Sequence, residues 1–193
     1  MSNTLLESVV KKNRARLIPF MLALYVLAFL DRSNIGFAKE TYQLDTGLSN
    51  EAYALWAGIF FVVYAFLGVP ANLLMRKFGA RKWIGCTTLL WGILSAAMAW
   101  ADTEAKFLLV RTLLGAAEAG FFPGMIYLTS QWFPQQNRAS IMGLFYMGAP
   151  LALTLGSPLS GALLEMHGFM GHPGWFWMFI IEGLLAVGAG FFT

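Results

Sequence analysis

The amino-acid sequence predicts an all-α membrane protein that crosses the bilayer six times. Hydrophobic residues make up 58% of the 193 residues and charged residues only 12%, about half the charge of an ordinary soluble domain. The chain also contains six apolar runs of about twenty residues, the length that a helix needs to cross a hydrocarbon core of ~30 Å. A globule of this size cannot bury six such runs, so we expect lipid to cover them.

Each apolar run is interpreted as one transmembrane helix, and the short connections leave no room for a soluble domain. Membrane-spanning β-strands would be about half as long and would alternate polar with apolar residues. The first run contains Asp31 and Arg32 and is too long for a signal-peptide core, so it is interpreted as a retained helix. The predicted spans are residues 17–38, 53–75, 83–101, 107–130, 139–164 and 175–193.

Loop charge predicts the orientation of the spans. On the side of the membrane that is predicted to face outwards, the only basic residues are Lys39 and Lys106, which lie among acidic residues. Lys and Arg near span ends remain in the cytoplasm, so both termini are expected to be cytoplasmic. Nine basic residues gather on the predicted cytoplasmic side: Lys11, Lys12, Arg14, Arg16, Arg76, Lys77, Arg81, Lys82 and Arg138.

Several classes of function are not expected. The net charge is only +3, which argues against nucleic-acid binding. The single cysteine, Cys86, excludes an intrachain disulfide and a cysteine-based metal cluster. The sequence contains no zinc-protease, serine-hydrolase or phosphate-loop motif, and His167 and His172 lie in a predicted outer loop. We therefore expect neither an enzyme nor a bound cofactor or metal.

Four ionisable residues lie well inside the predicted spans: Asp31, Arg32, Arg111 and Glu118. A charge at mid-membrane costs roughly 2.5–3.5 kcal/mol on insertion scales, so such residues are functional candidates by default. Arg111 and Glu118 are seven residues apart and share a helix face to within about 20°. Asp31 and Arg32 are about 100° apart on the first helix, so only one of them can point directly at a given site. Either one has the reach to snorkel towards the outer interface.

The four residues are suited to different tasks. An arginine fork binds a carboxylate through two hydrogen bonds and keeps its charge, so Arg32 and Arg111 suit an anionic substrate. Asp31 and Glu118 can gain and lose a proton as their neighbours change. An alternative is that these charges form static ion pairs that only stabilise helix packing.

Two further features surround these charges. Tyr64, near the middle of the second span, has a hydroxyl that suits a hydrogen bond to substrate, although packing explains a single membrane tyrosine equally well. Glu182 lies only about 10 Å below the predicted outer face, near enough to reach lipid headgroups, and is left out of the predicted site. In the fifth span, small residues recur at every fourth position, a spacing that favours ordinary close helix packing or a sliding contact between helices; they are Gly148, Ala152, Gly156 and Ser160. Pro150 and Pro158 interrupt this stripe and are expected to kink the helix.

Several motifs give the chain a family resemblance. Residues 30–38 read LDRSNIGFA, and residues 111–124 read RTLLGAAEAGFFPG. Together with residues 70–72, 79–82 and 131–139, they resemble the anion:cation symporters of the major facilitator superfamily, especially the bacterial sugar-acid branch. The first and fourth spans both carry internal charges, and three plus three spans form the inverted repeat of many secondary transporters.

The resemblance implies a role for each candidate residue. Asp31 and Glu118 match protonatable carboxylates, Arg32 a substrate-binding arginine, Tyr64 a cavity-lining position, and Arg111 the partner of the transport-site glutamate. The chain then resembles an N-terminal six-helix bundle of two inverted three-helix repeats, residues 1–193, which lacks the C-terminal six-helix half.

The resemblance also implies proton-coupled symport of an organic anion, a sugar acid such as rhamnonate, across a bacterial inner membrane by alternating access. The expected partners are the anion, a proton, the bilayer and a second six-helix bundle. The alternative is a truncated, non-transporting membrane fragment or interaction module whose buried charges are structural.

Overall fold

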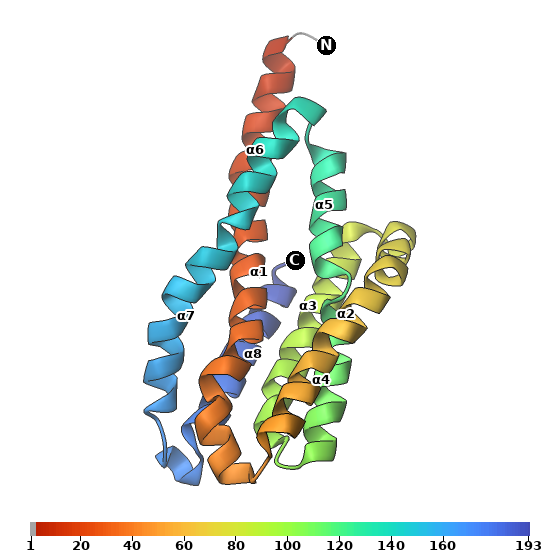
Figure 1. Ribbon diagram of the computed structural model, residues 1–193. Coiled ribbons are helices and arrows are strands. Elements are labelled where there is room, and N and C mark those ends of the chain that lie inside the picture. Colours follow the sequence, from red (N-terminus) through yellow and green to blue (C-terminus); the bar gives the residue numbers. More distant parts are fainter. Residues whose placement is uncertain (1–2) are drawn as a thin grey trace.

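The structure is a computed structural model that describes residues 3–193, and it is all-helical over that range (Figure 1). Six helical segments are long and apolar enough to cross a membrane, which confirms the six predicted spans. The helices are α1 (Asn3–Thr46), α2 (Asn50–Phe78), α3 (Ala80–Ala97), α4 (Glu104–Glu118), α5 (Phe121–Trp132), α6 (Gln135–Tyr146), α7 (Gly148–Leu164) and α8 (Gly174–Phe191), with short 3₁₀ turns at Met98–Trp100 and Phe169–Gly171.

The fourth and fifth spans are each broken into two helices; the sequence indicates an interruption of the fifth span at Pro150 but not the break in the fourth span. The fourth span breaks between α4 and α5, just before Pro123, and the fifth breaks between α6 and α7, just before Pro150. Proline lacks the N–H that would bond four residues back, and its ring crowds that carbonyl. Pro158, in contrast, lies inside α7 without ending it. The first break places Glu118 at the last residue of α4.

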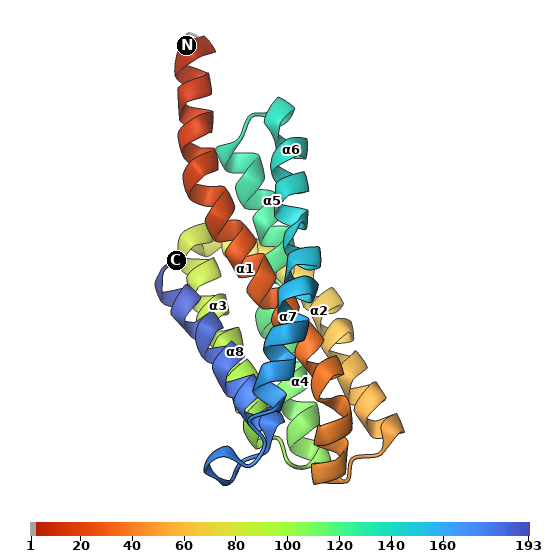
Figure 2. The same cartoon turned by 90° about the vertical axis from the view of Figure 1, so that its left-hand side faces the viewer.

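The helices pack in three main pairs. α3 lies along α8, α2 along α4, and α1 along α7 (Figures 1 and 2). Exchanging the first three spans with the last three turns the α1–α7 pair into the pair formed by α4 and α2, and it returns the α3–α8 pair to itself. This pattern is that of two inverted three-helix repeats.

The small-residue stripe of the fifth span forms the α1–α7 contact. A Cβ at Gly148 would lie 2.7 Å from the Tyr25 ring, and one at Gly156 would lie 2.6 Å from Leu30. Ala152 and Ser160 are fully buried. The prediction that this stripe serves close helix packing is therefore confirmed.

The connections alternate between two ends of the bundle (Figure 1). We call one end the acidic end; it holds the α1–α2, α3–α4 and α7–α8 connections. The other, the basic end, holds the two termini and the α2–α3 and α5–α6 connections. At the basic end a single residue, Gly79, joins α2 to α3 with φ 88°, a left-handed conformation that glycine adopts without strain.

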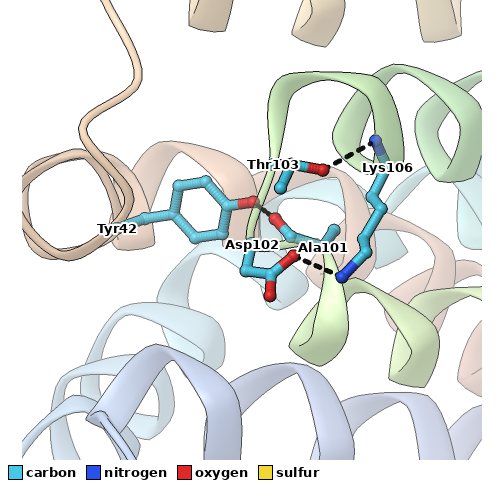
Figure 3. Close-up of polar contacts among 5 residues, drawn as sticks. All are labelled: Tyr42, Ala101, Asp102, Thr103 and Lys106. Atoms are coloured by element: carbon cyan, nitrogen blue, oxygen red, sulfur yellow. Dashed lines mark hydrogen bonds and ion pairs between the residues drawn. The ribbon is translucent and has the colours of Figure 1, made fainter.

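Polar contacts tie α1 to the α3–α4 connection at the acidic end (Figure 3). The Tyr42 hydroxyl donates a hydrogen bond to the Ala101 carbonyl. Thr103 caps α4 by accepting a hydrogen bond from the backbone N–H of Lys106 at 3.4 Å. The Lys106 ammonium lies 2.5 Å from Asp102 Oδ1, and this hydrogen bond lowers the pKa of the exposed Asp102 carboxyl below its ordinary value.

Two apolar clusters fill the bundle, and a polar layer separates them. The first cluster includes Leu24, Phe60 and Trp91, and the second, nearer the acidic end, includes Tyr42 and Phe107. The polar layer lies between them along α1, α4, α7 and α8. Its fully or nearly fully buried members are Asp31, Asn34, Arg111, Glu118, Ser160 and Glu182.

Candidate functional site

The centre of the polar layer is an ion pair between α1 and α4. Arg32 Nη2 lies 2.8 Å from Glu118 Oε2, and Arg32 Nε donates a hydrogen bond to the same oxygen at 2.9 Å. The Glu118 side chain is fully buried, whereas 16% of the Arg32 side chain is exposed. Among the described residues, Glu118 Oε1 has no hydrogen-bond partner. Arg32 therefore joins a buried carboxylate to the accessible side of the bundle.

Aromatic rings surround the Arg32 guanidinium. Its central carbon lies 4.7 Å from the centroid of the Tyr64 ring and 5.7 Å from those of Phe29 and Phe60. Tyr64 and Phe60 stack with their centroids 5.9 Å apart. Aromatic faces attract a cation without forming hydrogen bonds with it. The rings therefore hold the guanidinium in place and leave the N–H donors that do not contact Glu118 available to an anion.

Arg111 lies on α4, one helical turn before Gly115, where α4 comes close to α2. Its guanidinium carbon lies 4.8 Å from the Phe60 centroid, on a side chain that is 1% exposed. The Nε and Nη2 atoms of Arg111 have no hydrogen-bond partner in the described part of the chain. α2 comes this close because Gly115 lacks a Cβ, which would lie 2.5 Å from the Phe60 carbonyl oxygen. A buried guanidinium with open donors is suited to receive an anion.

Asp31 is a second buried acid near the pair. It is 6% exposed, and its Oδ2 has no hydrogen-bond partner within residues 3–193. Its carboxyl group is near enough to interact electrostatically with Arg111 and Glu118. All five sequence-predicted site residues therefore face the same polar layer, at the centre of which Arg32 and Glu118 are in direct contact.

Some expectations about individual residues need correction. Asp31 and Arg32 do not snorkel to an interface, because both take part in the buried layer. Arg111 and Glu118 share the inward face of α4, as predicted, but the direct partner of Glu118 is Arg32. Glu182 does not reach headgroups: it is 4% exposed and accepts a hydrogen bond from Ser160 Oγ at 3.2 Å.

The sequence analysis also missed Phe60 and Asn34 as neighbours of the charged residues. The sequence does not distinguish Phe60 from the other apolar residues of the second span. Asn34 lies three residues after Asp31, a spacing that places two side chains on one helix face and that offered a usable signal.

The charged residues of the site can bind both an anion and a proton. A carboxylate that enters beside Arg32 can replace Glu118 as its partner, and Arg111 offers further donors nearby. Glu118 would then be buried without a positive partner, a state that a bound proton relieves. The arrangement therefore suits coupled binding of an anion and a proton.

Comparison with known proteins gives a consistent result. The sequence profile described as Major Facilitator Superfamily matches residues 21–193. Over 193 residues the chain is 91% identical to the inner membrane transport protein RhmT of Escherichia coli K12, covering 100% of this chain and 45% of that protein. It is 50% identical over 186 residues to an Agrobacterium vitis protein named as a candidate tartrate transporter, covering 96% of this chain and 41% of that one.

A solved structure supports the same fold. It is a bacterial homologue of the human lysosomal transporter Spinster, in an inward-facing and occupied conformation. The match has a TM-score of 0.86 at 20% sequence identity and covers 93% of this chain and 43% of that one. The chain thus spans less than half the length of each of these three proteins.

Proposed function

The chain belongs to the Major Facilitator Superfamily, and from that premise we propose that it supplies half of a secondary transporter that moves an organic anion together with protons. Membership in a transporter family agrees with the expectation that the chain is not an enzyme. The proposed whole protein pairs this six-helix bundle with a second one, and the substrate binds between them. The proposed membrane is the bacterial inner membrane, where the Escherichia coli relative is named to reside.

The observation that carries the proposal is the partly exposed Arg32 in contact with the fully buried Glu118. In the proposed cycle a substrate carboxylate binds Arg32 and Arg111, and Tyr64 orients it. Glu118, with Asp31, takes up a proton when Arg32 turns to the substrate. Since anion and proton cross together, the empty carrier resets only after the carboxylate has released its proton.

A sugar acid is the proposed substrate class. Such a molecule has one carboxylate for the arginines and several hydroxyls for hydrogen bonds. The polar layer presents guanidinium groups for a carboxylate, and amide and carboxyl groups for hydrogen bonds to hydroxyls. The Agrobacterium vitis relative is named for tartrate, a hydroxy acid. Rhamnonate and tartrate are therefore the substrates to test first.

The test is uptake into proteoliposomes that contain the full protein. The wild type should accumulate labelled sugar acid when the internal medium is more alkaline. Glu118→Gln imitates the protonated acid, so it should lose this accumulation but retain exchange of labelled for unlabelled substrate. Normal gradient-driven accumulation by the variant would remove Glu118 from proton coupling. Loss of both activities would assign it to substrate binding or to a static ion pair.

The proposed orientation places the basic end in the cytoplasm. Its test replaces Cys86, which is exposed on α3, and introduces single cysteines at Glu165 and Lys82. An impermeant thiol reagent added to intact cells should label the cysteine at position 165 and leave that at position 82 unlabelled. The reverse pattern would overturn the orientation.

A further inference from the structure

A second group of buried polar side chains lies near Asp31. It consists of Asn34 on α1, Ser160 on α7 and Glu182 on α8, with exposed fractions of 0%, 0% and 4%. We call these three residues the Glu182 cluster. The proposed transport cycle does not use them, although Asp31 is near enough to interact electrostatically with Glu182.

The Glu182 cluster has too few hydrogen bonds for its burial. Glu182 Oε1 accepts the bond from Ser160, but Oε2 has no partner among the described residues. The Asn34 amide lies beside Glu182, yet neither its nitrogen nor its oxygen makes a hydrogen bond of good geometry within residues 3–193. Leaving a buried polar atom without a hydrogen-bond partner is costly. Several such atoms around one carboxylate therefore point to an occupant that pairs with them.

The charges around Glu182 indicate the sign of that occupant. Glu182 is the only charged residue of α8, and α7 has none. On α3, which packs along α8, the charged residues are Arg81 and Lys82 in the first turn at the basic end. On α1 the charged residue that interacts with Glu182 is Asp31, which is also acidic. No cation among the described residues of these helices therefore neutralises Glu182.

The charge balance of the whole polar layer leads to the same result. It contains two guanidiniums, Arg32 and Arg111, and three carboxyl groups, Asp31, Glu118 and Glu182. With all five ionised, the layer would hold one negative charge in excess. An uncompensated buried charge is far more costly than a neutral buried acid. A single bound positive charge therefore completes the layer.

We infer that the Glu182 cluster is a proton-binding site in which Glu182 is a carboxylic acid, with its hydroxyl on Oε2. The proton adds a donor on Oε2, and the Asn34 amide oxygen, which has no partner within residues 3–193, is an acceptor for it. Ser160 donates to the other oxygen of the same acid. This site is separate from Asp31 and Glu118, so the full protein holds one more proton than its coupling carboxylates account for. The inference rests on the proposed function only for the use of that proton in transport.

The test is infrared spectroscopy of the full protein in bilayers, which detects the carbonyl band of a protonated acid directly. The wild type at neutral pH should show a band that Glu182→Gln removes and that the exposed control Glu165→Gln leaves in place. Asp31→Asn removes a neighbouring negative charge, so the Glu182 band should disappear at lower pH than in the wild type. These readouts need no substrate and are therefore independent of the uptake assay.

Two further measurements test whether the band belongs to the Glu182 acid and whether a metal cation binds there instead. Ser160→Ala removes the hydrogen bond to the acid carbonyl, so the band should persist and move to higher frequency. A metal cation is the rival occupant, and it would make thermal stability higher in sodium chloride than in choline chloride, with the difference lost in Glu182→Gln. That sodium effect, the absence of a Glu182 band at neutral pH, or a band that Ser160→Ala leaves unshifted would each overturn the inference.

Discussion

At the α3–α8 contact, two helix backbones meet directly through glycines, whereas α1 and α4 are joined across the bundle by charged side chains. A Cβ at Gly92 would lie 2.6 Å from the Val187 backbone nitrogen, and one at Gly183 would lie 2.5 Å from that of Ala96. Between α1 and α4, the polar contact is the ion pair of Arg32 and Glu118, and nearer the acidic end the Tyr42 and Phe107 rings pack together.

This contrast indicates which part of the bundle can respond to a ligand. Backbones in contact cannot separate without losing their packing over the whole seam. An ion pair, in contrast, separates when a ligand replaces one partner. The α3–α8 seam is therefore expected to act as a rigid frame, and the α1–α4 link as the part that changes when an anion binds.

The largest expected effect tests the rigid frame. Gly92→Ala forces backbone atoms apart, so it should lower the free energy of unfolding by about 1–3 kcal/mol. The matched control is Gly188→Ala on α8, where an added Cβ meets nothing within 4 Å; it should leave stability unchanged or raise it by up to about 1 kcal/mol. Reversible unfolding in mixed micelles measures both. Equal losses in the two variants would contradict the idea of a tight seam.

The next effect tests the ion-pair link. Arg32→Lys keeps the positive charge but loses the fork that holds a carboxylate, so anion affinity should fall more than tenfold, about 1.4 kcal/mol. Arg16→Lys makes the same exchange at an exposed position and should leave affinity unchanged. Substrate binding to the purified full protein measures both variants. Unchanged affinity in Arg32→Lys would assign Arg32 a purely structural role.

The smallest effect concerns an ion pair that is not buried. The side chains of Lys106 and Asp102 are 55% and 61% exposed, so solvent screens their attraction. The pKa of Asp102 is lowered by Lys106, which means that the pair contributes stability above the ordinary pKa of aspartate, about 3.9. That contribution is lost as the pH falls through the lowered pKa.

Lys106→Ala should therefore reduce stability only slightly at neutral pH and not at all in acid. Chemical denaturation of the variant and the wild type at both pH values measures the difference. A loss comparable to that in Gly92→Ala would show that exposed polar contacts matter as much as the buried seam.

The sequence predicts the six helices because apolar run length and loop charge determine them locally. It also identifies Asp31, Arg32, Arg111 and Glu118, since any charge inside a span stands out. The partner of each charge is not predictable in the same way. Pairing depends on the rotation and crossing of helices that are distant in sequence, and adjacent residues such as Asp31 and Arg32 differ by only 100° in direction.

The prediction that Glu182 is near enough to reach lipid headgroups was wrong for a related reason. Counting residues from the span end gives its distance from the interface but not the neighbours that surround it. Ser160 on α7 and Asn34 on α1 enclose Glu182, so the side chain cannot extend to headgroups. A proline alone does not predict a helix break. The fourth and fifth spans break just before Pro123 and Pro150, whereas Pro158 lies inside α7 without ending it.

The one-residue turn at Gly79 has an electrical consequence. Because α2 and α3 meet there without a loop, the charges of Arg76, Lys77, Arg81 and Lys82 sit together at the tip of a stiff hairpin and cannot cross the bilayer one at a time. Each charge moved against a membrane potential of about 100 mV costs about 2.3 kcal/mol, so the four together cost about 9 kcal/mol. In an energised cell, the membrane potential therefore favours the proposed orientation, in which this hairpin tip lies on the negative, cytoplasmic side.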